Sequence, residues 1–488
     1  MRVAACSLSC ASIAAAQAGD AGHPDLPVVD DVYDPYEGMD KDGRIPAIEK
    51  PADLPNPDRW RYIPEGRIKP GNFFDRFLVT SFVVPVVFRD PDSGTGGGFG
   101  VTDIDFRSQR RREFAGFFFA YTTEKQQSYW GLWRRWLHHR ELPEGGVLQE
   151  ERSFVGVSGG YQKTLTRRFF GFGPNSKEKN EILYTDKLVE LELELEMAIP
   201  DPGADLVGTF GLRAEYHALS TNDFDCNTVF NVGGDPSAPG DAGCPGAWDQ
   251  TSVFRNGLDP ADVVGQTNRV RRAAQSSIDN DDHERSGYLV AGLRWDTRDS
   301  QRNPYSGFEL GALVEAPLLQ NEWDVGARYT LDASTVLAVP GIFHDGGVGN
   351  EENPPTDVIA FGANLWLTSG DMPFTGMPTL GGPHTLRGFQ AGRFRDDAAW
   401  HAGIEHRIWV ISRGFELTPT IRVERIGFAP FVEAGSVGSD GLDLFESEVK
   451  FSYGIGLRIL LERAAPFRLD VGLSDEGFQW TARFGYTF

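Results

Sequence analysis

One stretch of the chain, Leu380 to Asp396, combines fork-shaped cationic side chains with backbone freedom. It reads LGGPHTLRGFQAGRFRD and places Arg387, Arg393 and Arg395 among glycines and apolar residues. A guanidinium presents a planar fork of donors that fits a carboxylate, and glycines allow tight backbone conformations. The stretch has neither the period of a strand nor the apolar stripe of a helix, which favours a long ordered loop. These residue types predict a loop folded back onto an acidic surface.

Three other patterns have catalytic or metal-binding chemistry in some proteins. Gly156–Gly160 matches the G-x-S-x-G nucleophile elbow, but it lies within a strand pattern that no helix follows. His401, Glu405 and His406 are possible metal ligands, yet on a strand His406 points away from the other two. The acidic run Asp279–Glu284 lacks the glycine-turned loop of calcium modules. We therefore expect no enzyme activity, no cofactor and no metal site.

The segments around the arginine-rich stretch alternate between apolar and polar residues. Val358 to Thr368 precedes the stretch and Ala402 to Val410 follows it, which indicates a loop that joins two strands. The clearest alternation runs from Lys187 to Glu196, where a strand would place leucines on one face and acids on the other. Either a water-filled barrel or a soluble sandwich with a wet outer face would solvate that acidic face. In the barrel, four glutamates line the lumen: Glu190, Glu192, Glu194 and Glu196.

Composition favours one large β domain and does not exclude a membrane barrel. The chain has 488 residues with 57 glycines and 34 phenylalanines but only 5 methionines, a balance that favours strands and turns over helices. No run of eighteen apolar residues is present, which excludes a spanning helix but not spanning strands. The net charge of -23 opposes binding to nucleic acid or to anionic headgroups. It suits divalent cations or a cation-selective lumen.

Alternating segments of this kind recur along the chain and predict an all-β fold, a transmembrane antiparallel β-barrel of sixteen strands. An even strand count lets both ends meet on one side of the membrane and leaves no open sheet edge. The long connections 220–285 and 370–398 would be extracellular, the second folded inward, and the short ones at 200–203 and 463–466 periplasmic. The predicted strands lie near residues 78–88, 97–106, 112–122, 127–138, 153–165, 183–198, 205–219, 286–298, 306–318, 323–340, 356–369, 399–412, 424–437, 449–462, 466–474 and 478–488.

The N-terminal part predicts export. Residues 1–18 resemble a secretory signal peptide that ends at a small-residue cleavage site; a disordered tail is the alternative. Residues 19–72 are rich in Asp and Pro, which predicts a disordered or extended periplasmic leader, and residues 73–488 form the barrel. Cys226 and Cys244 flank a Gly/Pro/Asp-rich stretch and would form either a disulfide or two free thiols.

These features together resemble the BamA/TamA-type outer-membrane assembly factor family, also called the bacterial surface antigen family. Leu386-Arg387-Gly388-Phe389 matches the family's arginine-glycine-aromatic motif in the sixth extracellular loop. In the family this arginine enters the barrel and pairs with an acid of an aromatic-x-acid-x-glycine strand motif. Phe431–Gly435 fits that motif, with Glu433 where the family usually has aspartate. The resemblance therefore implies that Arg387 pairs with Glu433 on the inner wall.

Two further motifs extend the resemblance, and a short segment, Phe170–Ser176, adds a third echo of the family. The family's strand-end motif matches Asp296, Arg298 and Asp299, ahead of Asn303-Pro304 and Gly307. The C-terminal strand signal, read by the outer-membrane assembly machinery, would comprise the outward aromatics Phe484, Tyr486 and Phe488. One departure concerns Gly19–Asn72, which is too short and too polar for a polypeptide-transport-associated (POTRA) domain. The resemblance covers the barrel alone.

The resemblance implies a protein of the Gram-negative outer membrane that assists insertion or transport of proteins or lipids. Its expected partners are outer-membrane lipid, lipopolysaccharide, the assembly machinery during its own insertion, and a protein or lipid cargo. Two alternatives stay open. A passive cation-preferring pore would use the lumenal glutamates, and an outer-membrane hydrolase would need a catalytic constellation that the sequence does not display.

Overall fold

The structure is a computed structural model. It describes residues 44, 48–63, 81–90, 94–103, 106–123, 125–142, 147–178, 182–220, 283–301, 303–320, 326–347, 351, 354–370, 372–418, 421–461 and 465–486. Cys226, Cys244 and Phe488 lie outside these residues.

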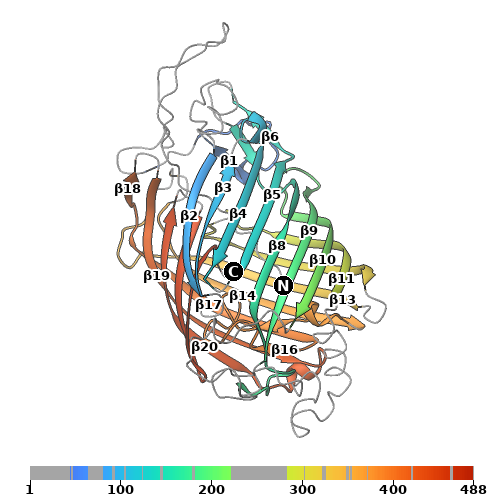
Figure 1. The fold of residues 1–488 in the computed structure, drawn as a ribbon. Coiled ribbons are helices and arrows are strands. Elements are labelled where there is room, and N and C mark those ends of the chain that lie inside the picture. Colours follow the sequence, from blue (N-terminus) through green and yellow to red (C-terminus); the bar gives the residue numbers. More distant parts are fainter. Residues whose placement is uncertain are drawn as a thin grey trace.

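Sixteen strands form one antiparallel sheet that curls into a barrel (Figure 1). Each strand pairs with its neighbours along the chain. The sheet is curled, and its N-terminal strands lie beside its C-terminal ones. Each predicted strand has its counterpart within a few residues, which confirms the fold class. The strands are β2 (Ser81–Asp90), β3 (Gly94–Asp103), β4 (Glu113–Thr122), β5 (Gln127–Trp136), β8 (Phe154–Phe169), β9 (Ile182–Ile199), β10 (Leu206–Ser220), β11 (His283–Asp296), β12 (Gly307–Gln320), β13 (Gly326–Val339), β14 (Asp357–Gly370), β17 (Ala398–Ile411), β19 (Ile421–Gly438), β20 (Lys450–Leu461), β21 (Ala465–Ser474) and β22 (Gly477–Phe484).

The period of two in the sequence decides which side chains face outward. On β9, Leu191, Leu193 and Leu195 are exposed on the outer surface, whereas Glu196 is buried on the inner one. Across the pair of strands, Glu192 stands opposite Arg213 on β10, so acids and bases meet inside the barrel. A strand places successive side chains on opposite faces, and this sequence uses one face for lipid and the other for charge.

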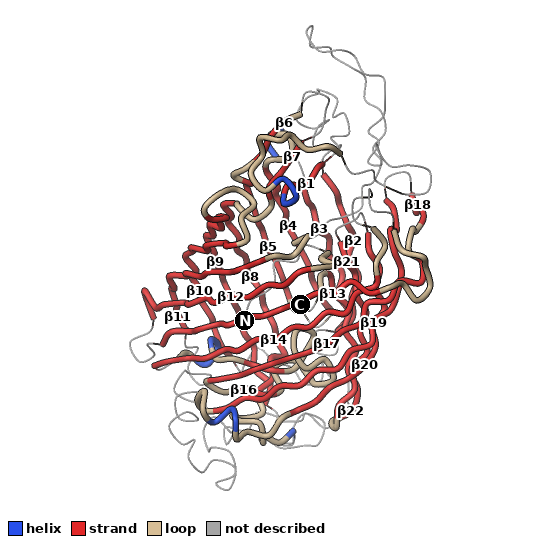
Figure 2. Tube along the Cα trace, turned by 180° about the vertical axis from the view of Figure 1, so that it is seen from behind, coloured by secondary structure: helices blue, strands red, loops and turns tan. Residues whose placement is uncertain are grey.

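Short helices lie at the two ends of the barrel (Figure 2). Among the described residues, no helix is long and apolar enough to cross a bilayer. The short helices are η1 (Pro57–Arg59), η2 (Phe106–Ser108), η4 (Phe374–Gly376) and η5 (Asp443–Phe445).

A small second sheet sits at the end predicted to face the periplasm, where β1 and β6 are labelled in Figure 1. It has the order β1–β7–β6 and joins part of the predicted leader to the β5–β8 connection. Leu54 and Trp60 of the leader are buried against Leu148. Residues 48–63 of the leader are therefore ordered, because Leu54 and Trp60 pack against Leu148. The average composition of the leader does not predict this contact. The bounds are β1 (Trp60–Ile63), β6 (His139–Glu141) and β7 (Val147–Glu150).

The arginine-rich stretch folds into the barrel from the opposite end. It forms a two-stranded hairpin of β15 (Thr379–Leu380) and β16 (Phe394–Arg395), near the bottom of Figures 1 and 2. Its apolar side chains pack against the inner face of β17 and β19, which confirms the predicted inward fold. This cluster, named here the inner cluster, consists of Leu380, Leu386, Phe389, Phe394, Ala399 and Val437. A short strand, β18 (Phe415–Thr418), extends the β17–β19 hairpin at the end of the barrel opposite to β15 and β16.

Candidate functional site

Arg387 lies inside the barrel, with only 1% of its surface exposed. Its Nε donates to Glu433 Oε1 at 2.8 Å, and its backbone N donates to Glu433 Oε2 at 2.8 Å. Its Nη1 donates to Glu405 Oε2 at 2.9 Å. The guanidinium also lies 3.4 Å from the ring centroid of Phe431, a cation–π contact strengthened by exclusion of water. One loop arginine therefore binds two strands, β17 through Glu405 and β19 through Glu433.

Glu405 is the centre of this network, which extends onto β20 and β21. Besides Arg387, it accepts from Arg407 Nε at 3.0 Å and from Arg458 Nη2 at 2.6 Å. Arg458 Nη1 in turn donates to Asp470 Oδ1 at 2.7 Å. All of these groups are buried, and a buried charge is tolerated only when partners satisfy it. Arg387 is thus part of a lattice of buried charges that connects four strands on their inner face.

Glycines without a side chain allow the loop backbone to lie close to the wall. A Cβ on Gly388 would lie 2.4 Å from the carbonyl oxygen of Leu473, closer than real contacts allow. Gly381 adopts a φ of +102°, where a side chain is strained, and a Cβ there would meet Gln390 O at 2.2 Å. Gly388 of the motif is therefore needed for the close approach, and Gly381 for the tight turn.

Arg393 binds a different part of the molecule. Its Nε donates to Glu476 at 2.8 and 2.9 Å, and its Nη1 donates to the Ser176 hydroxyl at 2.8 Å. Its guanidinium lies 4.6 Å from the ring centroid of Phe170. The segment Phe170–Ser176, which echoes the family in sequence, therefore contacts the same loop. Arg395 is buried as well.

A family model described as the Omp85 superfamily domain matches residues 160–488, more than half of the chain. The chain belongs to the Omp85 superfamily. It is a β-barrel of the bacterial outer membrane. The match includes both the Arg387 loop and the strands that it contacts.

Two solved structures are similar to this Omp85 barrel. BamA from Haemophilus ducreyi lacking POTRA domains 1–3 shares 13% identity with a TM-score of 0.45, and the match covers 83% of this chain and 70% of that one. CdiB from Acinetobacter baumannii shares 11% identity with a TM-score of 0.42, over 83% of this chain and 58% of that one. A search among curated proteins finds no match.

The four lumenal glutamates do not form a uniform acidic surface. Glu190, Glu192 and Glu194 are partly exposed on the inner face, but Glu196 is buried and accepts from Arg294 Nη2 at 2.8 Å. Arg213 likewise pairs with acids of β10 and β12, namely Glu215 at 3.0 Å and Glu315 at 2.6 Å. These inward arginines are not among the residues that the sequence motifs predict. Their signal is an arginine at an inward position of an alternating strand.

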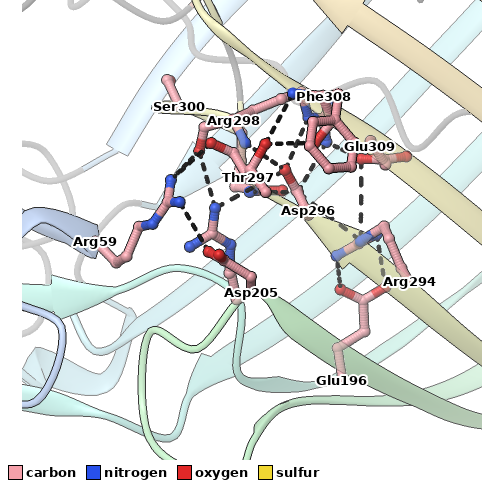
Figure 3. Close-up of polar contacts among 12 residues, drawn as sticks. Arg59, Glu196, Asp205, Arg294, Asp296, Thr297, Arg298, Ser300, Phe308 and Glu309 are labelled. Atoms are coloured by element: carbon pink, nitrogen blue, oxygen red, sulfur yellow. Dashed lines mark hydrogen bonds and ion pairs between the residues drawn. The ribbon is translucent and has the colours of Figure 1, made fainter.

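The strand-end motif forms a second buried site at the end of the Omp85 barrel that is predicted to face the periplasm (Figure 3). Asp296 is fully buried and accepts from Arg298 N at 3.0 Å, Nε at 3.1 Å and Nη2 at 3.0 Å. Gln301 Nε2 donates to it at 2.8 Å. Arg298 also pairs with Glu309. Burial alone would lower the pKa of Arg298, but its ion pairs with Glu309 and Asp296 raise the pKa above the usual value.

Asp299 shapes the turn that follows. Its Oδ1 accepts from the backbone N–H of Tyr305 at 3.1 Å and of Ser306 at 3.3 Å. Burial raises the pKa of Asp299 above its usual value, although these two backbone donors oppose the change. The motif residues that the resemblance selected thus divide into a charge cluster, Asp296 with Arg298, and a turn-forming carboxylate, Asp299.

The leader reaches this motif through Arg59, which sequence analysis did not select. Arg59 Nη1 donates to the carbonyl oxygens of Thr297 at 3.0 Å and Arg298 at 2.6 Å, and Nη2 donates to Asp205 at 2.7 Å (Figure 3). Arg152 donates to the same Arg298 oxygen at 2.9 Å. One guanidinium therefore connects the leader to the β9–β10 and β11–β12 turns.

We expect Arg59→Ala to release the leader from the barrel, because three hydrogen bonds of Arg59 are lost, each worth about 0.5–1.5 kcal/mol and up to ~3 with a charged partner. The measurement is limited proteolysis of the folded protein, in which residues 48–63 should be cut faster than in the parent chain. Arg61→Ala is the matched control, since Arg61 pairs with Glu151 of the β5–β8 connection. Equal cutting of both variants would contradict the assignment.

Tyr486 corrects the prediction for the C-terminal strand. Strand β22 ends at Phe484, and Gly485 has a φ of +89°, so Tyr486 does not continue the alternation. Its hydroxyl donates to Asn303 Oδ1 at 2.8 Å, and the Arg407 guanidinium lies 3.7 Å from its ring centroid. Tyr486 therefore points inward, not outward. The side chain of Phe484 and the whole of Phe488 are not among the described parts.

Proposed function

We propose that this protein assists the insertion or transport of proteins or lipids at the outer membrane, without catalysing a chemical reaction. The observation that supports it is the docking of Arg387 onto Glu405 and Glu433 inside an Omp85 barrel. In this proposal the loop braces the inner wall, while the junction between β2 and β22 opens for cargo. Residues 1–18 act as the export signal, 19–72 as a periplasmic leader and 73–488 as the membrane domain.

Strand pairing suits this task because a client strand has the same backbone chemistry as the barrel's own strands. A strand at the end of a sheet presents a row of N–H and C=O groups that can pair with another chain. In lipid an unpaired backbone group costs several kcal/mol, roughly, so exchange of partners at a seam offers a low-barrier route. A rigid inner wall would keep the remaining barrel closed during such an exchange.

The proposal is tested with purified full-length protein in lipid vesicles. A urea-unfolded model barrel is added, and its insertion is followed by the mobility difference between folded and unfolded forms on an unheated gel. We expect faster insertion than into vesicles that contain a porin of similar size. Equal rates in the two preparations, together with equal rates of phospholipid exchange between leaflets, would exclude both protein and lipid handling. The proposed partners in the cell are lipopolysaccharide, outer-membrane lipid and the assembly machinery.

A passive cation-preferring pore remains the second candidate, because Glu190, Glu192 and Glu194 face the lumen and are partly exposed. We expect only small conductance in a planar bilayer, since the Arg387 loop packs inside the barrel. A large, steady, cation-selective current from the parent chain would favour the pore. The triple variant Glu190→Gln, Glu192→Gln, Glu194→Gln is its control, because a glutamate-lined pore would lose its cation preference.

A further inference from the structure

The β19–β20 loop carries two unusually exposed apolar side chains. Leu442 is 80% exposed and Phe445 is 88% exposed. The next large apolar side chain among those described, Leu319 on the barrel surface, is 66% exposed. Contact with water at this level is unfavourable for groups of this size, so such a pair marks a surface that another apolar phase can cover.

The loop is folded, and its acids are directed at its own backbone. Asp440 Oδ1 accepts from the N–H groups of Leu442 at 2.8 Å and Asp443 at 2.9 Å. Asp443 Oδ2 accepts from Ser439 N at 2.7 Å. These bonds fix η5 and present Leu442 and Phe445 in a defined position. Asp440 and Asp443 are thereby bonded to the backbone of the loop.

The loop lies on the outer surface of the barrel wall. Val437 belongs to the inner cluster, so its neighbour Ser436 points outward. Ser436 is nevertheless only 1% exposed, and its hydroxyl donates to Glu448 O at 2.7 Å. The returning end of the loop therefore covers the outer face of β19.

A second contact shows how far the loop extends across that surface. Trp366 packs against the inner cluster, so Leu367, the next residue on β14, points outward. A Cβ on Gly441 would lie 3.4 Å from Leu367 Cδ2. Since β17 lies between β14 and β19, the loop crosses the outer face of β17. Leu444 is buried, while Leu442 and Phe445 stay exposed.

We propose that residues 439–449 form a membrane foot, which inserts Leu442 and Phe445 into the acyl region of the outer leaflet. Lipid is the occupant because the foot continues the lipid-facing surface: Phe451, Tyr453 and Val432 are exposed on the outer faces of the two strands that it connects. The opposite face of β17 and β19 carries Glu405 and Glu433. The foot therefore packs on the outer face of β17 and β19, the two strands that Arg387 binds on their inner face. This inference depends on the membrane location and not on the proposed transport function.

The test uses spin labels in the full chain, with its four native cysteines replaced by serine. Leu442→Cys and Phe445→Cys are labelled separately with a nitroxide and placed in vesicles of phosphatidylethanolamine and phosphatidylglycerol. Collisions are measured with oxygen, which concentrates in hydrocarbon, and with a nickel chelate, which stays in water. We expect both labels to favour oxygen, as a label at the lipid-facing control Phe451→Cys does.

Ser439→Cys is the matched control on the same loop and should favour the nickel chelate. Folding of every variant is checked by its heat-modifiable gel mobility. If the labels at 442 and 445 both give the oxygen-to-nickel ratio of the label at 439, the foot is in water and the proposal is overturned. Because the vesicles contain no other protein, that result would also leave a protein partner as the remaining occupant.

Discussion

Arg387→Ala is expected to lower the temperature at which the folded, fast-migrating form of this barrel converts to the unfolded form. The substitution leaves Glu433 buried without its arginine, whereas Glu405 keeps Arg407 and Arg458. Removing one partner of a buried ion pair typically destabilises a protein by about 3–5 kcal/mol, because the remaining charge is uncompensated. The cation–π contact with Phe431 is lost as well. The measurement is the gel shift of unheated and heated samples over a series of temperatures.

Two variants separate the geometry of Arg387 from its charge. Arg387→Lys keeps the charge but cannot donate to Glu433 and Glu405 as a fork, so we expect an intermediate shift. Arg393→Ala removes another arginine of the same loop, whose partner Glu476 is partly exposed, and it should shift the transition less. An unchanged transition in Arg387→Ala would show that the loop does not brace the wall.

The pairing of Arg387 with Glu433 could be anticipated because both residues lie in short motifs of a known family. The roles of Glu405, Arg458 and Asp470 could not, since their contacts depend on which residues stand opposite one another across three strand pairs. A change of register by one residue would turn each of these side chains to the lipid face. Only the folded register reveals that the arginine reaches a lattice and not a single acid.

The strands were predictable because many strands of the wall alternate between apolar and polar residues. The leader and the C-terminus did not obey that rule. Trp60 is buried against Leu148 of β7, far away in the sequence, and local composition cannot report such a contact. Tyr486 turns inward because Gly485 leaves the extended conformation, so extrapolating the period of two past β22 gave the wrong side.

The lumen also differs from the acidic surface suggested by the sequence. The glutamates of β9 identify the inward face of that strand, but they do not predict the arginines that stand beside them on β10 and β11. Arg294 and Arg213 reach across to acids of β9, β10 and β12, so part of the acidic charge is neutralised. A protein with a net charge of -23 can therefore have an inner wall of paired charges, which supports a bracing role better than a uniform cation path.

Asp296→Ala should produce a comparable loss of stability at the opposite end of the barrel. Asp296 accepts four hydrogen bonds while fully buried. Its loss leaves Arg298 with Glu309 alone and removes the acid 3.8 Å from Arg152. We expect a destabilisation of about 3–5 kcal/mol, the usual result of leaving buried charge unpaired. The effect should be measurable as a lower gel-shift temperature and as faster hydrogen exchange in the β11–β12 turn.

Asp205→Ala provides the comparison, because Asp205 contacts the same Arg59 but its side chain is 40% exposed. An exposed pair contributes only about 0–1 kcal/mol, so this variant should loosen the leader and leave the barrel transition nearly unchanged. If Asp296→Ala behaved like Asp205→Ala, the motif would serve only to dock the leader. If its loss also speeds exchange in the turn, Asp296 organises the barrel end on which the leader rests, and leader docking is a consequence of that order.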